Sequence, residues 1–232
     1  MTGPSPIGIV AGSGIELGPL LDRVTRSREF SEVPGLSETA VDGHGGLVVE
    51  GYCADIPIVL QCGRLHLYEG HPYEQVTRSV DLMHGLGVCA ILFTNAAGAL
   101  AADIHPGNLM AATRMSLYPY NSWPGRPDSL ELDFELDRCD RRGTYVWVHG
   151  PCYETQAEVA ALQSLEGDAV GMSTAPEVMR CHELGVRAGA ISCITNDCGS
   201  PGVLRHEDVV RTARSASQKL CKVVRAWIEE QR

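Results

Sequence analysis

Short apolar runs recur along the chain, and most of them are continuously apolar rather than alternating with polar residues. The runs are IGIVAG (7–12), PIVLQCG (57–63), CAILFTNAAG (89–98), NLMAAT (108–113), TYVWVHG (144–150) and AGAISCITN (188–196). Continuous hydrophobicity over this length is typical of strands that are covered on both faces. The pattern therefore predicts buried strands at these positions.

Two longer segments have apolar residues at helical spacing. From Pro72 to Leu86, the apolar positions are Val76, Val80 and Met83, and Pro72 suits the first turn of a helix. From about residue 207 to residue 228, an apolar stripe runs along one helical face. It consists of Val209, Val210, Ala213, Ala216, Leu220, Val223, Val224 and Trp227.

A third helix is predicted from its end signals. Thr174 and Glu177 have the spacing of a capping box, and Gly185 is a suitable stop. Strands that alternate with helices predict an α/β fold with a mixed, twisted sheet flanked by helices. We expect residues 1–232 to form a single domain, because α/β domains of this length are common.

The ends of the predicted strands are rich in polar residues and glycine. They are GSG (12–14), GRLHLY (63–68), TNAAG (94–98), HGPCYE (149–154) and TND (195–197). In open α/β sheets, ligands bind beyond the carboxyl ends of the strands. We therefore expect these ends to converge on one pocket.

Composition and charge restrict the possible partners. The 232 residues include 19 Lys and Arg against 29 Asp and Glu, for a formal net charge of −10. A net negative charge repels nucleic acid and anionic lipid at long range, so neither is an expected partner. An anionic ligand would need a locally basic pocket.

Several features favour a cytoplasmic protein. The nine cysteines are odd in number and never spaced as Cys-x-x-Cys, so neither a disulfide framework nor a zinc site is indicated. The first ten residues lack the pattern of a secretion signal. The uncharged segment 85–102 contains polar residues and glycines, and we interpret it as a central strand with its loop. Residues 118–142 lack a clear period and predict a long surface excursion.

Ser13, Arg64 and His66 are candidates for an anion site. Arg64 and His66 alternate across Leu65, so they share one face if the strand continues. A guanidinium fork, an imidazole and a hydroxyl suit a phosphate dianion. The ordinary alternatives are a solvated strand edge for Arg64 and His66 and a tight strand-to-helix turn for the glycines around Ser13.

Tyr153, Glu154 and Asn196 are candidates for binding a heterocycle. An aromatic face and a carboxylate suit a purine, and an amide matches a 6-oxopurine edge because it both donates and accepts. The alternatives are that Glu154 serves a helix dipole, that Asn196 caps a turn and that His206 is only a neighbour of a helix N-cap.

Several motifs agree in order along the chain. They are GSG (12–14), GHGG (43–46), GRLHLYEGH (63–71), TNAAG (94–98), GPCYETQAE (150–158), VGMSTAPEV (170–178), ITN (194–196) and HEDVV (206–210). Together they resemble the trimeric purine nucleoside phosphorylase family, which includes the phosphorylases of inosine, guanosine and 5′-methylthioadenosine. The resemblance covers nearly the whole chain, and the pair GPxxET and VGMST is its most specific part.

The resemblance implies a homotrimer that cleaves purine (deoxy)nucleosides with inorganic phosphate as co-substrate, to give the free base and a sugar 1-phosphate, without a metal or organic cofactor. It implies a phosphate site of Ser13, His44, Arg64, His66, Ala96 and Ser173. It implies a nucleoside site of Tyr68, Ala97, Gly98, Tyr153, Glu154, Met172, Asn196 and His206. The residues that it implies for catalysis are Asn196, Glu154, His66 and His206.

The same resemblance bears on substrate choice. Methylthioadenosine phosphorylases have Asp at the positions of Asn196 and Cys198, so the residues here favour 6-oxopurines. A phosphorylase of methylthioadenosine or other 6-aminopurine nucleosides is the alternative, because a one-residue shift would bring Asp197 to the base. A non-catalytic nucleoside-binding paralogue is the third reading.

Two departures from the family pattern stand out. The GSG loop is longer by Ile15 and Glu16, and Glu16 must point outward if phosphate binds nearby. The chain is also shorter across residues 109–143, where the family supplies an aromatic residue to a neighbouring subunit. The candidates for that contact are Tyr118, Tyr120 and Trp123.

Overall fold

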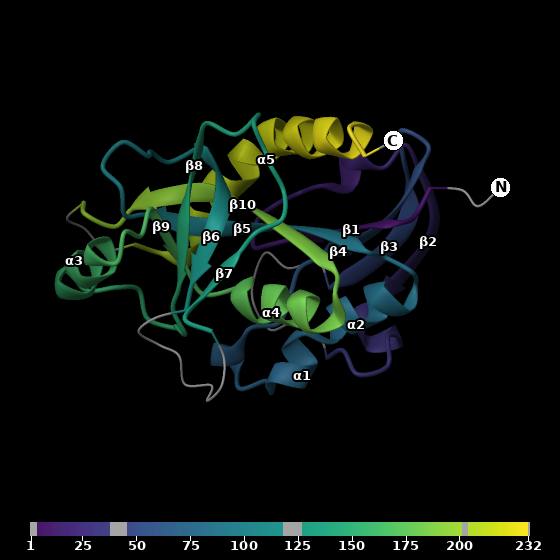
Figure 1. The fold of residues 1–232 in the computed structure, drawn as a ribbon, viewed down its shortest axis with the longest axis horizontal. Coiled ribbons are helices and arrows are strands. Elements are labelled where there is room, and N and C mark those ends of the chain that lie inside the picture. The colour runs from purple at the N-terminus through teal and green to yellow at the C-terminus, as the bar shows by residue number, and fades with distance from the viewer. Residues whose placement is uncertain (1–3, 38–45, 118–126, 201–203, 232) are drawn as a thin grey trace.

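A central β-sheet separates two groups of helices in the computed structural model, which describes residues 4–37, 46–117, 127–200 and 204–231. The α-helices are α1 (Tyr73–Val76), α2 (Arg78–Gly85), α3 (Gln156–Ser164), α4 (Ala175–Leu184) and α5 (His206–Glu229). Helix α5 lies along one side of the sheet, whereas α1, α2 and α4 lie on the other (Figure 1). Separate apolar clusters fill the two sides, one beneath α5 and one beneath α2 and α4.

The strands include all those predicted from the apolar runs. The strands are β1 (Ile7–Ala11), β2 (Arg23–Glu29), β3 (Leu47–Cys53), β4 (Ile56–Cys62), β5 (Ala90–Ala99), β6 (Leu109–Ser116), β7 (Ser129–Glu131), β8 (Arg141–Trp147), β9 (Ala169–Gly171) and β10 (Arg187–Asp197). The six predicted strands correspond to β1, β4, β5, β6, β8 and β10, and the mixed α/β fold is confirmed.

Strands β2, β3, β7 and β9 were not predicted. β2 is polar and mostly exposed because it forms the end of the sheet, where no apolar period is required. β7 and β9 contain three residues each, too few to leave a periodic signal. These strands exist because neighbouring strands supply their hydrogen bonds.

The sheet is mixed and partly closed. Its order is β10-β6-β8-β9-β5-β1-β4-β3-β2, with β7 paired to β6, and β10 also pairs with β5. The pairing of β10 with β5 closes the strands β5, β10, β6, β8 and β9 into a ring. β4, β1, β5 and β10 are consecutive and parallel, so their carboxyl ends lie at the same edge.

The three predicted helices are present, with one correction. The segment from Pro72 to Leu86 is not one helix: it breaks at Thr77, whose hydroxyl donates to the carbonyl of Tyr73 at 2.9 Å. α4 ends at Gly185, which has φ +69°, as its stop signal predicts. The apolar stripe of α5 is buried against the sheet at most of its positions.

The predicted surface excursion over residues 118–142 is borne out in part: most residues from 127 to 142 are exposed, but three of them are buried. Leu130 lies on β7 and is buried, and Phe134 and Leu136 are buried as well. The Phe134 ring lies 4.9 Å from the Trp227 ring of α5. The segment therefore extends the core despite its irregular pattern. Tyr118, Tyr120 and Trp123 lie outside the described residues.

Candidate active site

A cavity of about 390 Å³ opens where the strand ends meet. Its lining contains every predicted site residue that lies within the described part of the chain. These are Ser13, Arg64, His66, Tyr68, Ala96, Ala97, Gly98, Tyr153, Glu154, Met172, Ser173, Asn196 and His206. His44 lies outside the described residues. The expected convergence of the strand ends on one pocket is confirmed.

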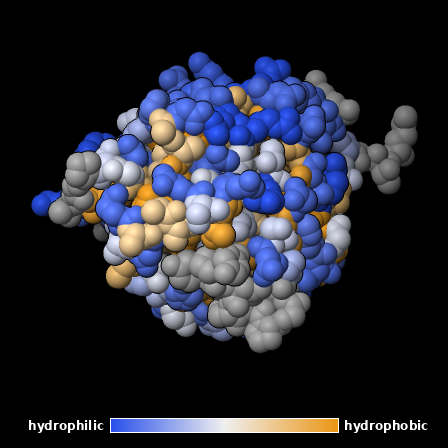
Figure 2. All heavy atoms as spheres, turned by 60° about the vertical axis from the view of Figure 1, so that its left-hand side comes forward, coloured by the Kyte–Doolittle hydropathy of each residue, from blue (hydrophilic) through white to orange (hydrophobic). Residues whose placement is uncertain are grey.

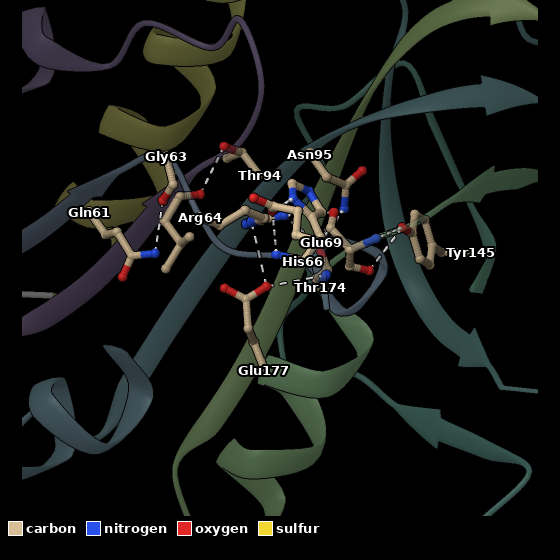
Figure 3. Close-up of polar contacts among 12 residues, drawn as sticks. Gln61, Gly63, Arg64, His66, Glu69, Thr94, Asn95, Tyr145, Thr174 and Glu177 are labelled. Atoms are coloured by element: carbon tan, nitrogen blue, oxygen red, sulfur yellow. Dashed lines mark hydrogen bonds and ion pairs between the residues drawn. The ribbon is translucent and has the colours of Figure 1, made fainter. Parts of the chain in front are cut away.

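Arg64 is positioned by the end of β4. The strand stops at Cys62, and Gly63 turns the chain with φ +94°. Arg64 is 1% exposed, and its Nη1 donates to the hydroxyls of Ser173 and Thr174, both at 2.8 Å (Figure 3). Strand geometry ends at Cys62, so the condition that the strand continues through Arg64 and His66 is not met. The alternative of a solvated strand edge is wrong, because Arg64 is buried. Arg64 is a buried cation in the cavity lining.

His66 is oriented by a carboxylate. Its Nδ1 and its backbone N–H both lie 2.8 Å from Glu69 Oε1, and its ring stacks on Tyr68 with centroids 4.6 Å apart. Burial alone would raise the pKa of Glu69, but the hydrogen bonds from His66 outweigh it and lower that pKa. Glu69 is thus an acceptor, so Nδ1 carries the proton and Nε2 is the acceptor. Burial lowers the pKa of His66, which favours the neutral imidazole.

Asn196 lines the same cavity, at the point where β10 leaves its regular pairing. The register of β10 against β5 shifts between Ile194 and Asn196. The Asn196 Oδ1 accepts a hydrogen bond from the Thr195 hydroxyl at 3.0 Å. A Cβ on Gly98 would lie 3.0 Å from the Asn196 amide nitrogen and 2.4 Å from the Cys198 sulfur. The glycine of TNAAG therefore makes room for this amide.

Tyr153 and Glu154 follow β8 and precede α3. Tyr153 is 41% exposed at the mouth of the cavity. Glu154 is partly buried, and this burial raises its pKa. Gly150 lets this segment approach Met172 and Tyr68, since a Cβ there would lie 2.5 Å from the Met172 sulfur and 3.0 Å from the Tyr68 ring.

Asp197 points away from the cavity. It is exposed, and its carboxylate accepts from the Gly199 backbone at 2.8 Å and from the Ser200 hydroxyl at 2.7 Å. These hydrogen bonds lower its pKa. The cavity lining includes Asn196 but not Asp197. The one-residue displacement that would bring the Asp197 carboxylate into the cavity in place of the Asn196 amide is thus not observed.

The N-terminal loop combines structural glycines with a lining hydroxyl. A Cβ on Gly12 would lie 2.8 Å from the Thr94 carbonyl oxygen, and one on Gly14 would lie 2.7 Å from the Val210 carbonyl oxygen. Both glycines are therefore needed for close packing, as the tight-turn alternative proposed, while Ser13 between them lines the cavity. Glu16 points outward and pairs with Arg214 at 2.8 Å, as required.

Sequence reasoning missed a buried polar group at the cavity, in which Asn95 lines the cavity and Thr174 and Glu177 lie behind the lining. Asn95, Thr174 and Glu177 are each 1% exposed or less. The Asn95 amide donates to the Thr174 hydroxyl at 3.0 Å, and Glu177 Oε2 lies 3.5 Å from Arg64 Nε (Figure 3). Thr174 and Glu177 were recognised only as a helix cap, because a capping pattern carries no information on burial.

Three further properties concern the molecule outside this cavity. The face shown in Figure 2 is mostly hydrophilic, with apolar side chains gathered toward its left side. Within the described ranges, no helix is both long and apolar enough to cross a bilayer. Among the same residues, no group of three or more His, Cys, Asp and Glu side chains is arranged to hold a metal ion.

Known proteins share this fold and much of this sequence. A sequence model of the phosphorylase superfamily matches residues 6–229. A purine nucleoside phosphorylase from Bos taurus is 34% identical over 247 residues, which cover 92% of this chain and 85% of the relative.

Solved structures agree with the sequence comparison. The Schistosoma mansoni purine nucleoside phosphorylase in complex with inosine has a TM-score of 0.81 and 26% identity, covering 96% of this chain and 89% of that one. A Schistosoma purine nucleoside phosphorylase in complex with hypoxanthine has a TM-score of 0.79 and 27% identity, covering 96% and 90%.

Proposed function

The chain belongs to the phosphorylase superfamily, and we propose that it cleaves 6-oxopurine nucleosides with inorganic phosphate. The products are the free base and (deoxy)ribose 1-phosphate. One observation carries the proposal: Arg64 and Asn196, from distant parts of the chain, line the same cavity of about 390 Å³. That cavity offers a cation at one end and an amide with a carboxyl group at the other.

The Arg64 end of the cavity suits phosphate. The buried guanidinium and the hydroxyls of Ser13 and Ser173 are donors, and Ser173 directly precedes the N-terminal turn of α4. His66 presents an acceptor at Nε2, which suits either a protonated phosphate oxygen or a sugar hydroxyl. Phosphate held here would lie beneath the anomeric carbon of a sugar resting against Tyr68 and Met172, with the 5′-hydroxyl near His206.

The Asn196 end suits a 6-oxopurine. A purine amide edge presents an N1–H donor to Glu154, and Asn196 can donate to O6 or accept from a protonated N7. Adenine has no proton on N1, so the Glu154 carboxylate would face a lone pair. The structures of relatives with inosine and hypoxanthine support the same class of base.

The chemistry follows from where charge develops. As the glycosidic bond breaks, the sugar gains oxocarbenium character and the purine gains electrons. The phosphate anion would stabilise the sugar cation and then bond to C1′. A hydrogen bond from the Asn196 amide to O6 would stabilise the leaving purine more than the bound nucleoside, which accelerates the reaction. Glu154 would accept the N1–H and orient the base.

We extend the proposal to assembly and location. Residues 1–232 would form one domain, the chain would act as a homotrimer as its family resemblance implies, and it would act in the cytoplasm. All nine cysteines lie in the described part of the chain as free thiols, which supports a reducing compartment. Light scattering of the purified protein tests the trimer.

The function is tested by phosphate-dependent release of base from inosine, guanosine, adenosine and methylthioadenosine. Wild type should release hypoxanthine and guanine only with phosphate. Asn196→Ala should lower kcat by about 10²–10³. Asp197→Asn is the matched control, because this neighbouring side chain points away from the cavity, and its rate should stay near wild type.

The other outcomes separate the alternatives. Preference for methylthioadenosine would replace the substrate class but keep phosphorolysis. Equal release without phosphate would identify a hydrolase. Nucleoside binding without base release, measured by calorimetry, would identify a non-catalytic paralogue.

A further inference from the structure

We propose that Glu177 is a positioning residue that holds together the two halves of the phosphate site, a role that rests on the proposed function. One half is the Arg64 guanidinium from the end of β4, and the other is the turn that carries Ser173 ahead of α4. Glu177 does not line the cavity, so any effect on phosphate must pass through these neighbours.

The first argument is that one oxygen of Glu177 contacts both halves. Oε2 accepts from the Thr174 backbone N–H at 3.2 Å and lies 3.5 Å from Arg64 Nε (Figure 3). The side chains of Arg64 and Glu177 are 2% and 1% exposed. A buried carboxylate and a buried cation at this distance fix each other, because neither can turn to water.

The second argument is the conformation of Thr174. It has φ +73° and ψ −42°, and the Ala175 N–H donates to the Ser173 carbonyl at 2.8 Å, which closes a three-residue turn. This turn is strained, and a β-branched residue adopts it only when its surroundings impose it. Here the surroundings are the Glu177 carboxylate on its N–H and two donors, from Arg64 and Asn95, on its hydroxyl.

The third argument concerns the Ser173 hydroxyl proton. Thr174 Oγ1 accepts from Arg64 at 2.8 Å and from Asn95 at 3.0 Å, so its own proton goes to Ser173 Oγ, 3.3 Å away. Ser173 Oγ also accepts from Arg64 at 2.8 Å. With both lone pairs engaged, Ser173 must donate its proton into the cavity, toward an acceptor such as a phosphate oxygen.

Glu177 thus orders a chain of hydrogen bonds that ends at the ligand. Without its carboxylate, the Arg64 fork loses its anchor and the Thr174 turn loses the acceptor for its N–H. The direction of the Ser173 hydroxyl then becomes unspecified. None of these hydrogen bonds involves Asn196, so the loss of Glu177 should leave the affinity for the base unchanged.

The test separates phosphate binding from nucleoside binding. Glu177→Gln keeps the shape and, with its amide oxygen in the place of Oε2, the acceptor for the Thr174 N–H, but it removes the negative charge opposite the guanidinium. It should raise the phosphate Kd and KM by roughly tenfold or more, the loss expected for one charge-assisted contact. The KM for inosine should change less than about twofold on the same reasoning. Glu177→Asp, which keeps the charge, should recover part of the phosphate affinity.

A second variant reaches the same chain from its other side. Thr174→Val keeps the β-branched shape and the contact of its N–H with Glu177, but it removes the relay to Ser173. It should also raise the phosphate KM selectively. Both variants are measured by calorimetry with inorganic phosphate as well as by turnover, so binding is read without chemistry.

The contrary outcomes are distinct. A lower phosphate Kd in Glu177→Gln would mean that Glu177 only weakens the field of Arg64, and the proposal would fail. If Glu177→Gln lowers the Tm but leaves the KM for phosphate and the KM for inosine unchanged, Glu177 acts only as a helix cap and the proposal fails. If wild type neither binds phosphate nor uses it in base release, the proposed function fails first, whatever the variants do.

Discussion

Helices α3 and α4 begin with the same local pattern, Thr-x-x-Glu, in opposite surroundings. At α3, Thr155 has an ordinary extended conformation, and its N–H and hydroxyl both contact Glu158 Oε2 at 2.8 Å in an exposed position. At α4, Thr174 is fully buried with φ +73°, and its hydroxyl is engaged by Arg64 and Asn95. One motif therefore caps an exposed helix in one place and lies buried behind the cavity lining in the other.

The two glutamates also differ in pKa. Hydrogen bonds from the Thr155 backbone and side chain lower the pKa of Glu158. Burial raises the pKa of Glu177 more than the nearby Arg64 lowers it. Ionisation favours the exposed cap, whereas burial makes ionisation of the Glu177 carboxyl costly. We take such a cost as a sign of function rather than of stability alone.

The largest expected effect comes from removing the cation of the buried cap. Arg64→Met leaves Glu177 buried without its partner and should lower the free energy of unfolding by about 3–5 kcal/mol. The double variant Arg64→Met/Glu177→Gln should recover most of that stability, because no unpaired charge remains, yet it should stay inactive. Urea unfolding and the base-release assay measure the two quantities.

That pair of variants also provides its own check. If the double variant is as unstable as Arg64→Met, the loss comes from packing of the arginine stem rather than from an isolated carboxylate. If the double variant regains activity, Arg64 has no part in binding phosphate.

A smaller effect is expected when glycine replaces each capping threonine. Thr155→Gly should cost about a few tenths of a kcal/mol. Thr174→Gly loses hydrogen bonds but relieves backbone strain of about 1–3 kcal/mol, so its net change in stability should also be small. Only Thr174→Gly should raise the phosphate KM, by roughly tenfold if one charge-assisted contact is lost. If Thr155→Gly and Thr174→Gly had the same phosphate KM, the two caps would not differ in function.

The smallest expected effect is in the pH dependence of stability. The folded pKa of Glu158 is lowered, so its contribution is present above pH 4.5 and is lost as the pH falls through that lowered value. The folded pKa of Glu177 is raised, so the folded state holds its proton more tightly and its contribution declines as the pH rises from 4.5 through the raised value.

Urea unfolding between pH 4 and pH 7 tests these opposite signs. As the pH is lowered, the free energy of unfolding should fall less in Glu158→Gln than in wild type. As the pH is raised, it should fall less in Glu177→Gln than in wild type. Slopes of the same sign in both variants would contradict the assignment of the two environments.

Much of the fold follows from local patterns. The continuous apolar runs predicted β1, β4, β5, β6, β8 and β10, because a strand buried on both faces leaves an uninterrupted apolar signal. Gly185 marked the end of α4. The exposed strand β2 and the buried Phe134 were missed, because their environments depend on neighbours that are distant in sequence.

The candidate site was predicted in the same uneven way. Side chains that line the cavity stand at strand ends, where polar residues after an apolar run are conspicuous. Asn95 belongs to the TNAAG strand end but was not singled out there, and Glu177 lies behind the cavity lining and carries no such signal, since it lies within a helix. The orientation of Asp197 also required coordinates, because adjacent residues of a strand point to opposite faces.

The sequence by itself determined the elements and the kinds of side chain at their ends, since both depend on residues close together in the chain. Only the tertiary structure decided which of two identical capping patterns would be buried against a cation. The reason is physical: the state of a carboxylate depends on water and on charges in space. For Glu177, the nearby charge comes from Arg64, on a different strand end far away in the chain.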